Sequence, residues 1–499
     1  MSITPPKSVL LSNGCEYCFG FSSCMDKKQS YFCGIKLGTQ HFDFPSTGSG
    51  SNSGGGETRN LETGAAHRTA KPSTKLNLET LELMKVYKFG GASVKTPQAL
   101  ENVYNIVSGE NELVIVVSAI DKTTNHLERL VNYYFNSDEQ KTVEFENIKK
   151  FHYDYANEAF GGKTEAVCKK LDVLFEEIAE RIDGVPTDDY DFEYDSIVSY
   201  GELLSTTIFS EYLRYRGKAN KFIDIRRYMV TDSNFRDAKI DWKLSEKKVR
   251  KAFSDANYNV FVTQGFIGSD KSHHTTTLGR EGSDYSASSI AHIIDAESVT
   301  IWKDVPGIMN ADPAWCDFAE KLDEISFHEA IELAFYGAKV IHPKTIKPIE
   351  NKNIPLYVRS FKDPSAKGTV IRKLDYYLDL VPVYILKQNQ VLISISPKDF
   401  SFIVEENMSN IFGLFAKYKV KVNVMQNSAI DFSASIDANN RNFDALVADL
   451  QKEYFVKYNE NLQLITIRYY TDEAINHMIS GHKVYMTQKS RKTARFVID

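Results

Sequence analysis

Between residues 84 and about 373, short apolar runs alternate with stretches whose apolar residues recur at helical spacing. This alternation constrains the fold more than any other feature, because it predicts a mostly parallel sheet with helices on its faces, an α/β fold. The run 112–119 (ELVIVVSA) is largely apolar, as expected of a strand covered on both sides. Further strands are expected at 259–267 and 298–302, and helices from Thr96-Pro97 and at 196–216, 283–294 and 326–336.

Composition excludes several classes of protein. The chain has 499 residues, 42% apolar and 25% charged, which is typical of globular proteins of two or three domains. Its net charge of −6 favours neither nucleic acid nor an anionic membrane as a partner. No apolar run approaches the ~18 residues of a membrane helix. We therefore expect a cytoplasmic protein without nucleic-acid or membrane partners.

The first 83 residues are expected to be a disordered extension and linker. Residues 47–56 read TGSGSNSGGG, a flexible composition, and Met84 directly precedes the first expected strand. The alternative is a small regulatory or metal-binding tail, because four cysteines lie here. Cys15 and Cys18 have the spacing of a zinc pair, but Cys24 and Cys33 do not repeat it.

A lysine and a glycine pair follow the first expected strand, in the sequence Lys88-Phe89-Gly90-Gly91. Glycine lets the backbone approach a phosphate closely, and the amide groups of such a turn can hold an anion. The lysine would add a full positive charge, a combination that suits phosphoryl transfer. The alternative is a plain tight turn.

Five later clusters carry groups capable of chemistry. Residues 118–125 offer hydroxyls for a phosphate or carboxylate, or else a helix cap through Thr123 or Thr124. In the sequence Ser199-Tyr200-Gly201-Glu202, the glutamate could hold an ammonium group or merely complement a helix dipole.

The cluster 275–285 (TTTLGREGSDY) places Arg280 between glycines at a helix start. Arginine binds carboxylates through two parallel hydrogen bonds. Asp284 could orient a lysine or help hold Mg²⁺, and the alternative is a helix capped by Ser283. The loop 302–313 could wrap a nucleotide base; the alternative is an ordinary surface loop. Lys339, in the sequence YGAKVIHP, could reach phosphates; the alternative is a solvated lysine.

Taken together, these clusters resemble the aspartate kinases in order and spacing, over residues 84 to 371. The resemblance implies the amino-acid-kinase fold, an α/β/α sandwich, with a catalytic domain at 84–373. It also implies transfer of the γ-phosphoryl group of ATP to the side-chain carboxylate of L-aspartate, the first step of lysine, threonine and methionine biosynthesis.

The resemblance also implies roles for single residues. Lys88 and Asp284 would be catalytic, and Mg²⁺ would be held mainly by the ATP phosphates. The positions matching ATP contacts are Lys88, Gly90, Gly91, Ser118, Lys303, Asp304, Met309 and Lys339. Those matching aspartate contacts are Thr124, Glu202, Arg280 and Ser283.

The chain departs from the family pattern at five positions. Ala92 and Lys303 stand where threonine is common, and Glu281 stands where glycine is common. Met309 replaces a common tyrosine, and Ala314 replaces an arginine. These departures put the details of ATP binding in doubt. Two alternatives stay open. One is another amino-acid-kinase member acting on a different carboxylate or carbamate, although Glu202, Arg280 and the C-terminal module argue against it. The other is a catalytically weak amino-acid sensor, which the departures at Lys303 and Ala314 suggest.

After a connector at 372–382, the expected order of elements is β-α-β-β-α-β, which predicts a ferredoxin-like unit within 383–499 that ends in a strand at 462–469. The unit is similar to the ACT domains of aspartate kinases, which bind effectors such as lysine or threonine and pair across a dimer. Residues 472–499 are too few for a complete second unit. Asn423 and Lys421 replace the aspartate and serine common in effector-binding members. A purely structural dimerisation module is the alternative.

Overall fold

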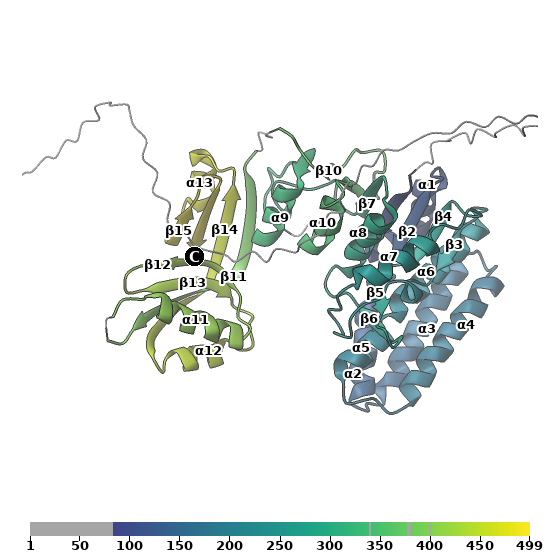
Figure 1. The fold of residues 1–499 in the computed structure, drawn as a ribbon, viewed down its shortest axis with the longest axis horizontal. Helices are drawn as coiled ribbons and strands as arrows, with labels where there is room; N and C mark the ends of the chain where they lie inside the picture. Colours follow the sequence, from purple (N-terminus) through teal and green to yellow (C-terminus); the bar gives the residue numbers. More distant parts are fainter. Residues whose placement is uncertain (1–82, 339–340, 377–380, 400) are drawn as a thin grey trace, which may run out of the picture. The chain divides into compact units, whose positions relative to one another are not determined.

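Eight strands form the sheet that the strand–helix alternation predicts (Figure 1). The computed structural model describes residues 83–338, 341–376, 381–399 and 401–499. The strand order is β3-β4-β2-β1-β7-β9-β10-β8, and all neighbours pair in parallel except β9 and β10. The strands are β1 (Lys85–Phe89), β2 (Leu113–Val117), β3 (Lys221–Ile223), β4 (Val260–Gln264), β7 (Ser298–Lys303), β8 (Glu324–Ser326), β9 (Leu356–Ser360) and β10 (Thr369–Arg372).

Alternate residues of the central strands enter two separate apolar cores, one on each face of the sheet. In β1, Tyr87 and Phe89 pack into one core and Val86 into the other, as the two-residue period of a strand requires. The first core is closed by α1 (Pro97–Ser108), α2 (Thr123–Phe135), α3 (Gln140–Ala159), α4 (Glu165–Asp183), α5 (Tyr190–Val198) and α6 (Tyr200–Tyr215). The second is closed by α7 (Trp242–Ala252), α8 (Gly282–Ile294), α9 (Phe327–Tyr336) and α10 (Pro343–Glu350). The α/β/α sandwich is confirmed.

Register brings the polar clusters together. Lys88 lies opposite Val116 of β2 and Ile301 of β7, so β1, β2 and β7 end side by side. Ser118 directly follows β2, and Lys303 is the last residue of β7. The carboxyl edge of the sheet therefore gathers side chains from segments about 200 residues apart.

Two local expectations differ from the structure. The helix expected at 196–216 is two helices, α5 and α6, which meet at Ser199. The strand expected at 259–267 ends at Gln264, and a short hairpin of β5 (Ile267–Ser269) and β6 (Thr275–Thr277) follows. The helix start at Thr96-Pro97 is confirmed, because the Thr96 side chain accepts a hydrogen bond from the Ala99 amide.

A six-stranded antiparallel sheet follows, in the order β12-β13-β11-β14-β16-β15. Its elements are β11 (Val383–Pro397), α11 (Glu405–Lys417), β12 (Val422–Asn427), β13 (Phe432–Asp437), α12 (Phe443–Leu450), β14 (Tyr454–Arg468), α13 (Asp472–Ile479), β15 (Val484–Lys489) and β16 (Thr493–Ile498). The β-α-β-β-α-β order is confirmed, but the final strand begins at Tyr454, eight residues before the expected 462. The C-terminal half of β14 pairs with β16, so the strands of residues 472–499, β15 and β16, extend the same sheet.

All described residues belong to one compact unit, Leu78–Asp499. The extension predicted for residues 1–83, with its four cysteines, lies outside the described residues except at position 83. Within the described part of the chain, no helix combines the length and apolar character needed to cross a membrane.

Candidate active site

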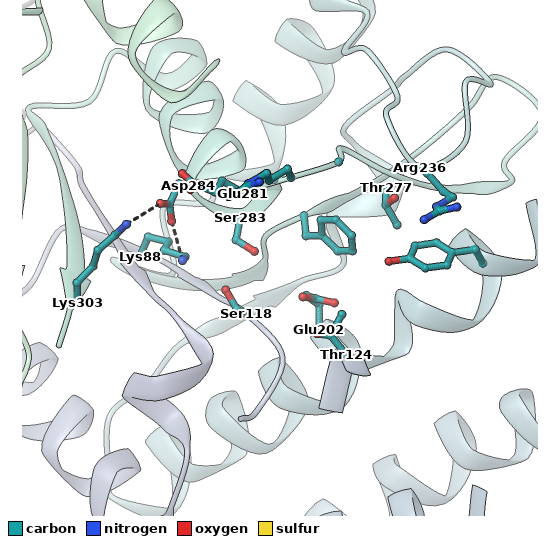
Figure 2. A pocket seen from close by; sticks show the side chains of 15 residues that line it. Lys88, Ser118, Thr124, Glu202, Arg236, Thr277, Glu281, Ser283, Asp284 and Lys303 are labelled. Carbon is teal, nitrogen blue, oxygen red and sulfur yellow. Dashed lines mark ion pairs between the residues drawn. The ribbon is translucent and has the colours of Figure 1, made fainter. Parts of the chain in front are cut away.

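A cavity of about 490 Å³ opens at the carboxyl edge of the eight-stranded sheet. Its walls come from β1, β7, the loop after β2, the starts of α2 and α6, and the turn that leads into α8 (Figure 2). Eight residues singled out from the sequence line it together: Lys88, Ser118, Thr124, Glu202, Arg280, Ser283, Asp284 and Lys303. The cavity therefore brings the lysine–glycine cluster, the Glu202 cluster and the Arg280 turn into one site.

Two lysines and one aspartate form a charged group at one end of the cavity. The Nζ atom of Lys88 lies 2.6 Å from Oδ1 of Asp284, and Nζ of Lys303 lies 3.7 Å from Oδ2 (Figure 2). Burial opposes ionisation of Asp284, but the two ammonium groups outweigh it and hold the pKa of this carboxyl below its usual value. Asp284 thus keeps both cations directed into a largely buried part of the cavity.

Glu202 is a buried carboxyl in the first turn of α6. Its Oε1 accepts a hydrogen bond from the Ala119 amide at 3.3 Å, and its buried Oε2 has no hydrogen-bond partner among the described residues. Burial raises the pKa of Glu202 to about 8, although the Ala119 amide and Lys88 oppose the shift. An unpartnered buried oxygen in a cavity wall indicates a ligand that supplies a donor.

Close backbone approach shapes the turn before α8. Gly279 has a φ of +74°, and a Cβ there would lie 2.6 Å from Oδ1 of Asp237. A Cβ at Gly265 would lie 2.6 Å from Cβ of Ser283, so that glycine lets the end of β4 reach the start of α8. The alternative of a helix capped by Ser283 is wrong, because α8 begins at Gly282 after Glu281 and has no side-chain cap.

Seven further lining residues are not among the site residues predicted from the sequence: Tyr194, Arg236, Phe266, Thr277, Gly279, Glu281 and Gly282. Thr277, Gly279 and Gly282 belong to the Arg280 cluster, and Glu281 is a departure from the family pattern. Glu281 adopts a φ of +55°, a conformation that glycine takes without strain, and its Oε2 is buried with no hydrogen-bond partner in the described structure. Tyr194 and Arg236 lie in no sequence motif that predicts a site residue.

Four predicted nucleotide contacts are not among the described residues that line the cavity: Gly90, Gly91, Asp304 and Met309. Gly91 has a packing reason for being glycine, since a Cβ there would lie 2.8 Å from the Ala119 carbonyl oxygen. Met309 forms an isolated β-bridge with Lys321. Lys339 lies outside the described residues. No group of three or more His, Cys, Asp or Glu side chains placed to hold a metal occurs in the described ranges.

Comparisons with known proteins agree with this geometry. The sequence model of the amino acid kinase family matches residues 84–360. The lysine-sensitive aspartokinase 3 of Escherichia coli is 33% identical over 364 residues, which cover 70% of this chain and 78% of the relative. Aspartokinase 3 of Arabidopsis thaliana, a chloroplastic protein, is 29% identical over 80% of this chain and 74% of the relative.

The solved structures of E. coli aspartokinase III are also similar. The complex with lysine and aspartate, in the T-state, has a TM-score of 0.70 at 27% identity and covers 83% of this chain and 95% of its own. The complex with aspartate and ADP, in the R-state, has a TM-score of 0.69 at 27% identity and covers 83% and 96%. The chain belongs to the amino acid kinase family and, within it, to the aspartokinases, kinases that phosphorylate aspartate with ATP.

Proposed function

We propose that the cavity binds ATP and L-aspartate side by side, and that its charged residues let the γ-phosphoryl group pass to the aspartate side-chain carboxylate. The observation that carries the proposal is the Lys88–Asp284–Lys303 group, which faces the same cavity as the unpartnered oxygen of Glu202. Lysines suit phosphates, and a buried carboxyl suits the ammonium group of an amino acid.

The chemistry needs charge neutralisation more than proton transfer. An aspartate carboxylate, with a pKa near 3.9, is already ionised at neutral pH and needs no general base. The barrier is repulsion between this anion and the triphosphate. Lys88 would stabilise the transferring group, because its ammonium is held at the cavity wall by Asp284 and can turn toward a phosphoryl oxygen. Arg280 and Thr124 would hold aspartate with Glu202, and Ser283 would assist them.

The residues present fit ATP with Mg²⁺. Lys303 and Ser118 line the cavity beside Lys88 and would contact phosphates, with Gly90, Gly91, Asp304, Met309 and Lys339 as further proposed contacts. Mg²⁺ would be held mainly by the ATP phosphates, with Asp284 and the unpartnered Glu281 oxygen as protein carboxylates near it. The metal would supply positive charge that neutralises the triphosphate.

The raised pKa of Glu202 predicts a pH-dependent affinity for aspartate. Below about pH 8 the empty site holds a neutral Glu202, and an ammonium ligand favours its carboxylate, so aspartate binding releases a proton. We expect kcat/KM for aspartate to rise by up to about tenfold per pH unit toward pH 8 and then to level off. Glu202→Gln should abolish the slope. A wild-type profile that is flat between about pH 6 and 8 would contradict this role.

The proposed reaction is tested by ADP release with three carboxylates: L-aspartate, L-glutamate and N-acetylglutamate. We expect ADP with aspartate alone. Release with another carboxylate would identify a different amino-acid-kinase activity. Tight binding of lysine or threonine without aspartate-dependent ADP would identify a sensor.

We further propose a domain division, with catalysis in 84–373, regulation in 383–499 and an extension in 1–83. Lysine is the proposed effector, with threonine as the alternative, because the E. coli relative is lysine-sensitive by name. In this chain Asn423 is held by its own protein, since its Oδ1 accepts a hydrogen bond from Lys387 Nζ at 2.9 Å and its Nδ2 donates to Gln390 and Asp437. The same kinase assay with lysine, threonine and both tests whether inhibition operates.

The regulatory sheet also supports a homodimer. Strand β12 lies at one edge of this sheet, and the apolar side chains of Phe402, Val404, Met425 and Ile430 are exposed in the chain as described. We propose pairing through this region, a cytoplasmic location, and a place at the first step of lysine, threonine and methionine synthesis. Sedimentation equilibrium of the full chain tests the dimer.

A further inference from the structure

The loop that carries Arg236 is held firmly against the cavity. Arg236 has a φ of +66°, an unusual conformation for a residue with a side chain. Its backbone N–H donates to Oδ2 of Asp195 at 3.0 Å, and the Thr277 N–H and hydroxyl donate to the same carboxylate at 2.7 Å each. Asp195 is fully buried, and burial raises its pKa to about 6. A buried carboxyl thus fixes two residues of the cavity wall.

This loop also touches the Arg280 turn. A Cβ at Gly279 would lie 3.1 Å from the Arg236 carbonyl oxygen and 2.6 Å from Oδ1 of Asp237. Arg236 and Arg280 therefore stand on adjoining segments of one wall, although they are 44 positions apart in the sequence.

The protein orients the Arg236 guanidinium through few contacts of its own. It lies 4.4 Å from the ring centre of Tyr194, which also lines the cavity. Its one ion pair within the described chain joins Nη1 to Oδ1 of Asp191 at 3.0 Å, and both side chains are about half exposed. Such exposed pairs contribute little to stability. A guanidinium has further N–H donors in a planar fork that matches a carboxylate.

In Figure 2, Lys303 and Lys88 lie toward one end of the row of labelled side chains and Arg236 lies at the other end, with Glu202 and Thr124 between Lys88 and Arg236. Aspartate has a reacting carboxylate, an ammonium group and a second carboxylate. If the reacting carboxylate lies at Lys88 and the ammonium group at Glu202, the second carboxylate lies on the far side of Glu202, toward Arg236.

On the basis of the proposed function, we infer that Arg236 is a substrate-binding residue that, together with Arg280, holds the carboxylate of aspartate that is not phosphorylated. Its contribution is to binding, so its loss raises KM for aspartate and leaves kcat largely unchanged. The ATP end of the cavity, at Lys88 and Lys303, is unaffected.

Arg236→Gly is the variant that tests this, because glycine keeps the N–H bonded to Asp195 and tolerates the positive φ. We expect KM for L-aspartate to rise at least about tenfold, with KM for ATP and the thermal midpoint unchanged. Asp191→Ala is the matched control, since it removes the protein partner of the guanidinium but keeps the guanidinium. This control should leave KM for aspartate within about twofold.

A substrate analogue identifies the group that is bound. Replacing the α-carboxylate of aspartate by an amide should raise KM in the wild type, and this penalty should shrink about tenfold in Arg236→Gly. An unchanged aspartate KM in Arg236→Gly, an unchanged amide penalty, or an Asp191→Ala variant with the same defect would overturn the inference. Absence of aspartate-dependent ADP release from the wild type would instead overturn the proposed function.

Discussion

Replacing Lys88 by alanine is expected to lower kcat by about 10²–10³ while the protein stays folded. The ammonium of Lys88 lies 2.6 Å from Asp284 at the cavity wall, where its side chain is 12% exposed. A charge that is held where little solvent screens it acts strongly on the charge that develops during phosphoryl transfer. Its removal also leaves Asp284 as a carboxylate facing the triphosphate, with Lys303 as its remaining ion-pair partner among the described residues.

The measurement is steady-state ADP release at saturating ATP and aspartate, with folding checked by circular dichroism. Lys95→Ala is the control, because Lys95 lies seven residues further along the same segment, pairs with Asp121 at 3.5 Å and has a side chain 55% exposed. It should retain wild-type kcat within about twofold. A folded Lys88→Ala protein with wild-type turnover would remove Lys88 from the mechanism.

Replacing Arg468 by methionine should lower the free energy of unfolding by about 3–5 kcal/mol. Arg468, at the end of β14, donates from Nε and Nη2 to the two carboxylate oxygens of Glu329 in α9, at 2.6 and 2.7 Å. Both side chains are nearly fully buried, at 6% and 4% exposure. Methionine fills part of the volume but leaves Glu329 as a buried carboxylate with only the Tyr469 hydroxyl to donate to it.

Urea unfolding followed by tryptophan fluorescence measures this loss. The matched control is Arg372→Met, which breaks the pair with Glu324 at 2.7 Å, where the arginine side chain is 50% exposed. That variant should lose less than about 1 kcal/mol. Equal losses in the two variants would show that burial of the Arg468–Glu329 pair carries no special stability.

Much of the site could be predicted from the sequence because parallel strands in register end at one edge. Lys88, Ser118 and Lys303 each stand at or just after the end of a strand, so their meeting follows once the three apolar runs are taken as neighbouring parallel strands. Glu202 and Asp284 could be placed because each lies in the first turn of a helix at the same edge.

Other parts depend on contacts that no local pattern encodes. Arg236 lies on a loop whose backbone N–H donates to the buried Asp195, which is distant in sequence and also accepts a hydrogen bond from the Thr277 N–H. The helix break at Ser199 is not visible in the sequence, because the apolar spacing continues across it. In the regulatory region, β14 is 15 residues long and so exceeds the strand expected at 462–469. Its pairing with β16 is non-local.

The central claim is that this cavity joins a phosphoryl group to a carboxylate, which makes an acyl phosphate. Trapping with hydroxylamine tests it most directly, since an acyl phosphate yields a hydroxamate and inorganic phosphate does not. With ATP, Mg²⁺ and L-aspartate, we expect hydroxamate in amounts equal to the ADP formed, at a rate about 10²–10³ lower in the folded Lys88→Ala protein. ADP formation accompanied by inorganic phosphate but no hydroxamate would contradict the account.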